Sequence, residues 1–60
     1  MKLLSVSEVA EICGVRRETV YRWIKDGELA SIRFDRVVRI DPSDLADFLK
    51  RKRKGANNES

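Results

Sequence analysis

Residues 14–27 read Gly-Val-Arg-Arg-Glu-Thr-Val-Tyr-Arg-Trp-Ile-Lys-Asp-Gly, and this stretch decides the predicted fold. Between its two glycines, Val20, Trp23 and Ile24 recur at the i, i+3, i+4 spacing of one helical face. The opposite face is basic and includes an aromatic hydroxyl; it comprises Arg17, Glu18, Tyr21, Arg22 and Lys25. A helix of about ten residues is roughly 15 Å long, and its diameter suits a B-DNA major groove about 12 Å wide. Taken alone, this pattern fits a solvated surface helix equally well.

Residues 4–13 predict a preceding helix with a well-defined start. Ser5 is the expected N-cap, and Glu8, three residues later, completes a capping box. Gly14 supplies the left-handed residue that commonly ends a helix. Because the next helix starts only a few residues later, the two together predict a helix-turn-helix. The expected apolar face of this first helix consists of Leu4, Val9, Ile12 and Cys13.

Residues 32–40 alternate between apolar residues and arginines in both halves, which predicts a β-hairpin. We expect its apolar face, with Ile32, Phe34, Val38 and Ile40, to pack on the helices, and its outer face to carry the arginines. The turn at Asp35-Arg36 lacks glycine, so we expect a loop slightly longer than two residues that includes Val37.

A last helix is predicted to begin after the hairpin. Asp41 is the expected N-cap and Pro42 the first helical residue. The helix is expected to fray near Lys54, which gives one domain over residues 1–54 and a disordered tail over residues 55–60. Its expected buried stripe consists of Leu45, Phe48 and Leu49.

The length and composition exclude several classes of function. A chain of 60 residues forms at most one domain. Its core is too small to enclose a deep active site, so we expect no enzyme. With no histidine and one cysteine, the chain can compose no zinc site, and we expect no cofactor. The sequence lacks a long apolar run and a secretory signal, so we expect a cytoplasmic protein that does not contact membranes.

The charge of the chain is distributed unevenly. The formal net charge is +3, yet without residues 50–60 eight basic residues face nine acidic ones. Within residues 16–40 seven cations face four anions, while other acids gather in the first and last predicted helices. This polarity favours a polyanionic partner that meets one face of the domain.

The order of helix, tight turn, helix, arginine-bearing hairpin and capped helix resembles the excisionase-type, MerR-like winged helix-turn-helix domain. The resemblance implies a mainly α fold of three helices plus a two-stranded wing, with the second helix in the major groove of duplex DNA. It implies that the wing reaches the flanking backbone or minor groove. Arg16 departs from the Ser or Thr usual in the family, and Asp35-Arg36 from the usual wing glycine. The matching stretches are residues 4–10, 14–15, 19–24, 27–29, 39–40 and 44–49.

The second predicted helix supplies the candidates for groove contact. The guanidinium of an arginine can donate two hydrogen bonds to one guanine, and the methyl group of a threonine can contact the methyl group of a thymine. Arg16 is a poor N-cap, and its cation could reach a phosphate at the helix start. Trp23 is either a core residue, which we favour, or a stacking platform. The groove candidates are Arg17, Thr19, Tyr21 and Arg22.

The helix end and the wing supply the candidates for backbone contact. Lys25, Arg33 and Arg39 are expected to hold phosphates rather than read bases. Arg36, at the tip of the wing, is equally expected to enter a narrow minor groove of DNA or to remain in solvent. The basic run at residues 50–54 is either a solvated helix end or, as we favour, a non-specific DNA clamp.

The function expected from the resemblance is that of an excisionase, a recombination directionality factor that organises or bends DNA for an integrase. The alternative is a small stand-alone regulator of transcription; the short chain favours the excisionase, since MerR-like regulators continue into a dimerisation helix. A protein-interaction module is a third hypothesis, which the arginines of the hairpin disfavour. We expect a free monomer that assembles head to tail on DNA, with Asp41, Asp44 and Asp47 near a neighbour's Arg33 or Arg36.

Overall fold

The computed structural model describes the backbone of residues 2–59 and the side chains of residues 2–53. It contains three helices and a small antiparallel sheet, which confirms the predicted winged helix-turn-helix architecture. The elements in chain order are β1 (Leu4–Ser5), α1 (Val6–Cys13), α2 (Arg17–Lys25), β2 (Ile32–Phe34), β3 (Val37–Ile40) and α3 (Pro42–Glu59).

Helix α1 begins with the predicted capping box. The backbone N–H of Glu8 donates to the Ser5 hydroxyl at 3.0 Å, and the Ser5 N–H donates to the Glu8 carboxylate at 2.8 Å. Gly14 ends the helix with a left-handed φ of 69°, also as predicted. The helix starts at Val6 rather than Leu4, because Leu4 and Ser5 instead form the short strand β1.

Helix α2 follows the tight turn and starts without a side-chain cap. Arg16 occupies the N-cap position and makes no capping hydrogen bond with its side chain. Beyond Asp26, Gly27 has a φ of 81° and turns the chain back toward the core. The backbone N–H groups of Glu28 and Leu29 then both donate to the Trp23 carbonyl, at 2.9 and 3.2 Å.

The sheet has the strand order β1-β3-β2, so the central strand pairs with β1 as well as with its hairpin partner. Leu4 lies opposite Ile40, and Ser5 lies opposite Arg39. The sequence did not predict β1, because a strand of two residues carries no alternation that could separate it from a helix cap. Its pairing anchors the base of the hairpin, residues 32–40, which we call the wing.

The wing turn differs from the sequence-based expectation. Phe34 pairs with Val37, so the loop is a two-residue turn of Asp35 and Arg36. Asp35 takes a φ of 55°, which supplies the positive angle that primed hairpin turns need. Aspartate tolerates this conformation better than most residues, so the turn forms without glycine.

The register of the wing also overturns the prediction of an all-arginine outer face. Ile32 lies opposite Arg39, and Arg33 lies opposite Val38. Because residues that face each other across a pair share one side of the sheet, each side carries both apolar residues and arginine. Ile32 and Phe34 were expected to pack on the helices but are exposed. For Ile32, Phe34, Val38 and Ile40 to share one side, Phe34 would have to pair with Val38, which requires a loop with an odd number of residues.

The hydrophobic core lies where α1, α2, β3 and α3 meet. Leu29, in the connector after α2, is 1% exposed and is a core residue that the sequence pattern missed. Ile12 and Leu49 were expected in the core but are 58% and 36% exposed, because they lie at the edges of their apolar stripes. The buried residues are Val6, Val9, Ala10, Val20, Leu29, Ile40, Leu45 and Phe48.

Helix α3 has the predicted start. The backbone N–H and hydroxyl of Ser43 both donate to the Asp41 carboxylate at 2.8 Å. The helical backbone continues to Glu59, beyond the end expected near Lys54. The division into a domain over residues 1–54 and a tail over residues 55–60 stays a prediction, and Ser60 lies outside the described residues.

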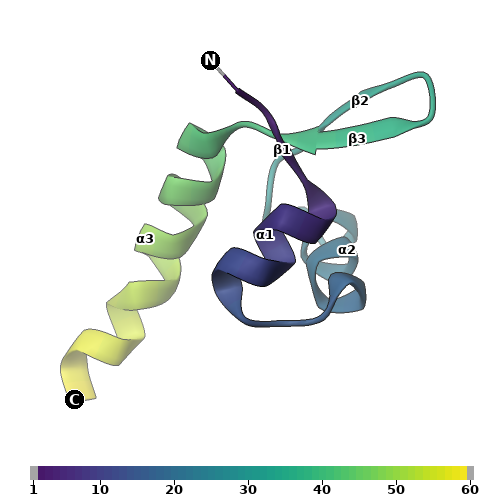
Figure 1. Cartoon of the computed structure of the whole chain (residues 1–60). Coiled ribbons are helices and arrows are strands. Elements are labelled where there is room, and N and C mark those ends of the chain that lie inside the picture. Colours follow the sequence, from purple (N-terminus) through teal and green to yellow (C-terminus); the bar gives the residue numbers. More distant parts are fainter. Residues whose placement is uncertain (1, 60) are drawn as a thin grey trace.

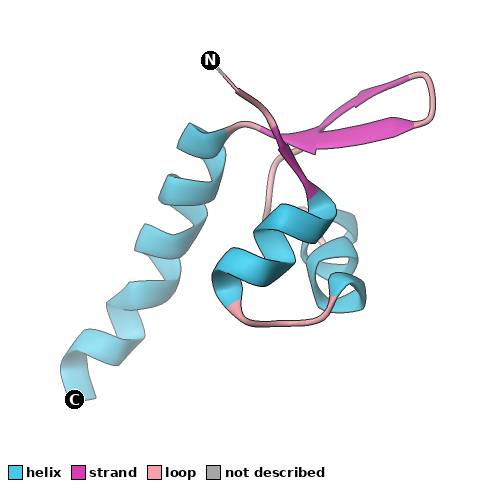
Figure 2. Ribbon diagram, in the orientation of Figure 1, coloured by secondary structure: helices cyan, strands magenta, loops and turns pink. Residues whose placement is uncertain are grey.

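The elements form a compact helical body from which the wing projects (Figure 1). Helices α1 and α2 pack together, and β3 contacts α1 at the base of the wing. In the view of Figures 1 and 2, α3 lies to the left and α2 to the right, with α1 in front of the space between them. The two outer helices meet through the ring contact of Trp23 and Phe48. The C-terminal end of α3 points away from the wing.

Candidate nucleic-acid interface

Helix α2 has the two faces that its sequence predicts. Val20 is fully buried, and Trp23 and Ile24 are half-buried against the core. Thr19 is half-buried at the boundary between the two faces. The solvent-facing side consists of Arg17, Glu18, Tyr21, Arg22 and Lys25, all of them exposed.

The start of α2 has an unusual charge for a helix N-terminus. Arg16 and Arg17 are both exposed there, and Glu18 is the acid of the first turn. The backbone N–H groups already give this end a partial positive charge, so cations add to the potential instead of offsetting it. This arrangement costs stability in the free chain and favours an anion, such as a phosphate, at the helix start.

A groove of about 260 Å³ lies between the helix-turn-helix and the wing. It brings Tyr21 of α2 together with Arg36 and Arg39 of the wing, which lie 15 and 18 residues further along the chain. Ser5 and Ser7, at the start of α1, also line it. The groove therefore joins the second helix and the wing into one surface.

The arginines of the wing have different surroundings. Arg33 and Arg36 are exposed, whereas Arg39 is half-buried and its guanidinium donates to the Val38 carbonyl at 3.0 Å. The hydrogen bond from the Ser5 N–H holds the pKa of the Glu8 carboxyl below its usual range, with a minor contribution from the positive charge of Arg39. Arg39 is thus partly committed within the protein, and Arg33 and Arg36 are the freer cations.

Trp23 packs in the protein rather than presenting its ring as a platform. Its ring centroid lies 4.7 Å from that of Phe48, and the ring planes are inclined by 44°. This contact matches the core assignment favoured from the sequence.

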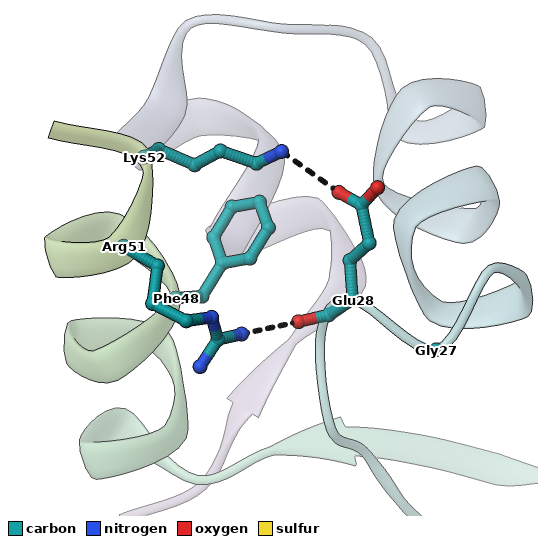
Figure 3. Close-up of a pocket in the computed structure, with 5 residues that line it drawn as sticks. All are labelled: Gly27, Glu28, Phe48, Arg51 and Lys52. Carbon is teal, nitrogen blue, oxygen red and sulfur yellow. Dashed lines mark hydrogen bonds and ion pairs between the residues drawn. The ribbon is translucent and has the colours of Figure 1, made fainter. Parts of the chain in front are cut away.

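The basic run at residues 50–54 has a structural role that sequence reasoning missed. Arg51 Nη2 donates to the Glu28 carbonyl at 2.6 Å, and Lys52 Nζ lies 2.9 Å from Glu28 Oε1 (Figure 3). Lys52 Nζ also lies 5.6 Å from the centre of the Phe48 ring. Two cations of this run thus tie α3 to the connector after α2, while Lys50 and Arg53 are exposed. The one sequence feature that could have indicated this contact is the acidic residue Glu28 in that connector.

The described part of the chain offers no metal-binding cluster. Within it, no group of three or more His, Cys, Asp or Glu side chains could hold a metal ion. No helix of the described chain is long and apolar enough to cross a membrane.

Two helices joined by a tight turn, a basic solvent-facing second helix and a paired wing define the class of winged helix-turn-helix proteins. The chain belongs to the helix-turn-helix domain family, whose model matches residues 3–53. The MerR-like subdivision suggested by the sequence resemblance is a finer assignment than this family match provides.

Two curated relatives come from Mycobacterium tuberculosis. They carry the names "Putative DNA-binding protein MT0521" in strain CDC 1551 / Oshkosh and "Putative DNA-binding protein Rv0500A" in strain ATCC 25618 / H37Rv. Each is 40% identical to this chain over 48 residues, which is 80% of this chain and 62% of the relative. The chain therefore spans less than two thirds of the length of these relatives. No solved structure matches the chain significantly.

Proposed function

We propose that this protein binds duplex DNA without catalysis, with α2 in the major groove and the wing against the flanking backbone and minor groove. The observation that carries the proposal is the single surface formed by the basic face of α2 and the wing, joined at the groove of Tyr21, Arg36 and Arg39. Membership of the helix-turn-helix family and the names of the two mycobacterial relatives support it.

The roles of the residues follow from their positions. We assign the exposed side chains in the middle of α2, Tyr21 and Arg22, to base edges, because they lie between the phosphate candidates at the helix start and Lys25 at the helix end. Thr19 presents less surface and is a weaker candidate. Arg16 and Arg17 suit a phosphate at the helix start, and the remaining backbone contacts are assigned to Lys25, Arg33, Arg36 and Arg39.

At the finer level, we propose an excisionase that organises or bends DNA for an integrase. The resemblance of the sequence to excisionase-type domains supports this choice, and a small regulator of transcription is the alternative. The polarity of the chain supports head-to-tail assembly on DNA, because acids on α3 could meet the basic wing of the next copy. An in-vitro assay with the integrase encoded nearest to this gene separates the two: an excisionase promotes excision over integration, whereas a regulator leaves the ratio unchanged.

Selection of duplexes from a randomised pool, followed by fluorescence anisotropy, tests DNA binding itself. We expect the wild-type chain to enrich a defined sequence and Arg22→Ala to bind it no better than random duplex. Lys50→Ala removes the same charge from α3 and is the matched control; it should keep the preference for the enriched sequence. Recovery of no sequence by the wild-type chain, or full specificity in Arg22→Ala, contradicts the proposal.

A further inference from the structure

The register of the wing separates its side chains into two chemically distinct sides. Leu4, Val38 and Ile40 share the side that packs against the core. The opposite side carries Ile32, Phe34, Val37 and Arg39, because each of these residues pairs with another of the same set. Three apolar residues thus face away from the core on a sheet of very short strands.

Two of the three apolar side chains on this outer side are exposed, and the third, Val37, is half-buried. Phe34 is 49% exposed and Ile32 is 39% exposed, and both belong to β2, an edge strand of the sheet. Proteins usually blunt edge strands with charge or cover them, because exposed apolar edges pair with other chains. An exposed phenylalanine beside the wing turn therefore indicates a binding surface.

The charges around Phe34 indicate what this surface binds. Arg36 follows it across Asp35 in the turn and is exposed, and Arg39 shares its side of the sheet, whereas Arg33 lies on the opposite side beside Val38. A suitable partner presents an apolar surface about as wide as one aromatic ring between flanking anions. The minor groove of DNA, about 6 Å wide, has this chemistry, because the carbon–hydrogen faces of its sugars lie between two rows of phosphates. Apolar side chains can also enter between base steps there and bend the duplex.

We infer that Phe34 is an apolar minor-groove wedge, an inference that rests on the proposed binding of duplex DNA. While α2 lies in the major groove, Phe34 enters the adjacent minor groove between the phosphate contacts of Arg36 and Arg39. It partly unstacks one base step and bends the duplex there. The wing then prefers flexible pyrimidine–purine steps, at which unstacking costs least.

The test uses the duplex that the wild-type chain selects from a randomised pool, with 2-aminopurine placed in turn at each step that flanks the α2 site. Binding of the wild-type chain should raise the fluorescence at one step and bend the duplex in a circular-permutation assay. Phe34→Ala should lose both signals and bind about 10-fold more weakly, within the range seen on truncating one base-packed aromatic side chain. Ile12→Ala removes a comparably exposed apolar side chain on α1 and is the matched control; it should keep both signals.

Further variants and duplexes separate a wedge from a surface that binds a second copy of the chain. Phe34→Leu keeps an apolar side chain and should retain part of the bend, and circular dichroism checks that each variant is folded. Unchanged bending and fluorescence in Phe34→Ala overturn the wedge while leaving DNA binding by α2 intact. If Phe34→Ala weakens occupancy only on duplexes with two sites, the surface binds a second copy and the wedge is wrong. If the wild-type chain selects no duplex, the proposed function fails, and the wedge fails with it.

Discussion

The indole ring of Trp23 packs on the phenyl ring of Phe48, with 4.7 Å between the ring centroids and 44° between the ring planes. Inclined aromatic pairs at this separation add favourable energy beyond the area they bury. The contact joins α2 to α3, so the orientation of the basic helix depends on a residue distant in the sequence. Phe48 is 1% exposed, which makes this pair part of the core.

Replacement of Trp23 should therefore affect folding before it affects binding. We expect Trp23→Ala to lower the free energy of unfolding by about 3 kcal/mol, at the low end for a large aromatic residue because Trp23 is only half-buried. Urea denaturation followed by circular dichroism measures this loss. An unchanged urea denaturation curve together with lost DNA binding would mean that Trp23 belongs to the binding face.

Arg22→Ala is the converse case on the same helix. Its side chain is exposed, so we expect the free energy of unfolding to change by no more than about 0.5 kcal/mol. The same denaturation experiment measures it, alongside the binding assay that Arg22→Ala should fail. A loss of stability as large as that of Trp23→Ala would show that Arg22 supports the fold.

The contacts of Glu28 predict a small effect for a substitution that removes its charge. Glu28→Gln breaks the ion pair with Lys52, whose two side chains are about half exposed, but keeps the hydrogen bond from Arg51 to the Glu28 carbonyl. Exposed pairs contribute at most about 1 kcal/mol, so we expect a loss below that value. Thermal denaturation should place Glu28→Gln close to Glu11→Gln, a control on the exposed surface of α1. A much larger loss would assign the main anchoring of α3 to the side-chain pair.

The helix caps predict how stability depends on pH. The backbone N–H of Ser5 lowers the pKa of Glu8 below 4.5, and the backbone N–H of Ser43 lowers the pKa of Asp41 below 3.8. As the pH falls below these values, the unfolded chain takes up protons before the folded chain does. The stabilisation from both caps is therefore complete above about pH 5 and is lost progressively as the pH falls through the lowered pKa values.

Glu8→Gln tests this dependence. The variant keeps an oxygen that can accept from the Ser5 N–H but has no carboxyl to titrate. We expect its stability, measured by urea denaturation from pH 3 to pH 7, to fall less steeply on acidification than that of the wild-type chain. An equally steep fall would contradict the assignment of the acid sensitivity to this cap.

The helices were predictable because their signals are local. Ser5, Glu8 and Gly14 lie within a few residues of the groups that they bond or terminate, so their identities and spacing were sufficient. The outward face of α2 followed in the same way from the spacing of Val20, Trp23 and Ile24. These features depend little on the rest of the chain.

The sidedness of the wing was not predictable in this way. It depends on whether the turn contains two residues or three, since one residue shifts every partner to the opposite side of the sheet. Asp35 adopts the positive φ that the two-residue turn needs, and the alternation of apolar residues and arginines does not reveal this. The anchoring of α3 to Glu28 likewise depends on a contact across 23 residues of chain.

The assembly proposal can be tested on the free chain and on DNA. We expect sedimentation to give a monomer, and adjacent sites on one duplex to be occupied more tightly than a single site, because neighbouring copies add binding energy. Asp44→Asn should weaken the gain from tandem sites while leaving single-site affinity unchanged. A stable free dimer, or equal affinity for single and tandem sites, would rule out the row of copies.

The proposed function requires the basic face of α2 and the wing to bind the phosphates of duplex DNA. The most direct measurement is the affinity for the selected duplex as a function of salt concentration. Each phosphate contact contributes about −0.9 to the slope of log affinity against log salt, so about five contacts predict a slope of about −4 to −5. The double variant Arg33→Ala, Arg36→Ala should make this slope shallower by up to about 2. Binding that does not weaken with salt, or a slope unchanged in the double variant, would show that this surface does not bind DNA phosphates.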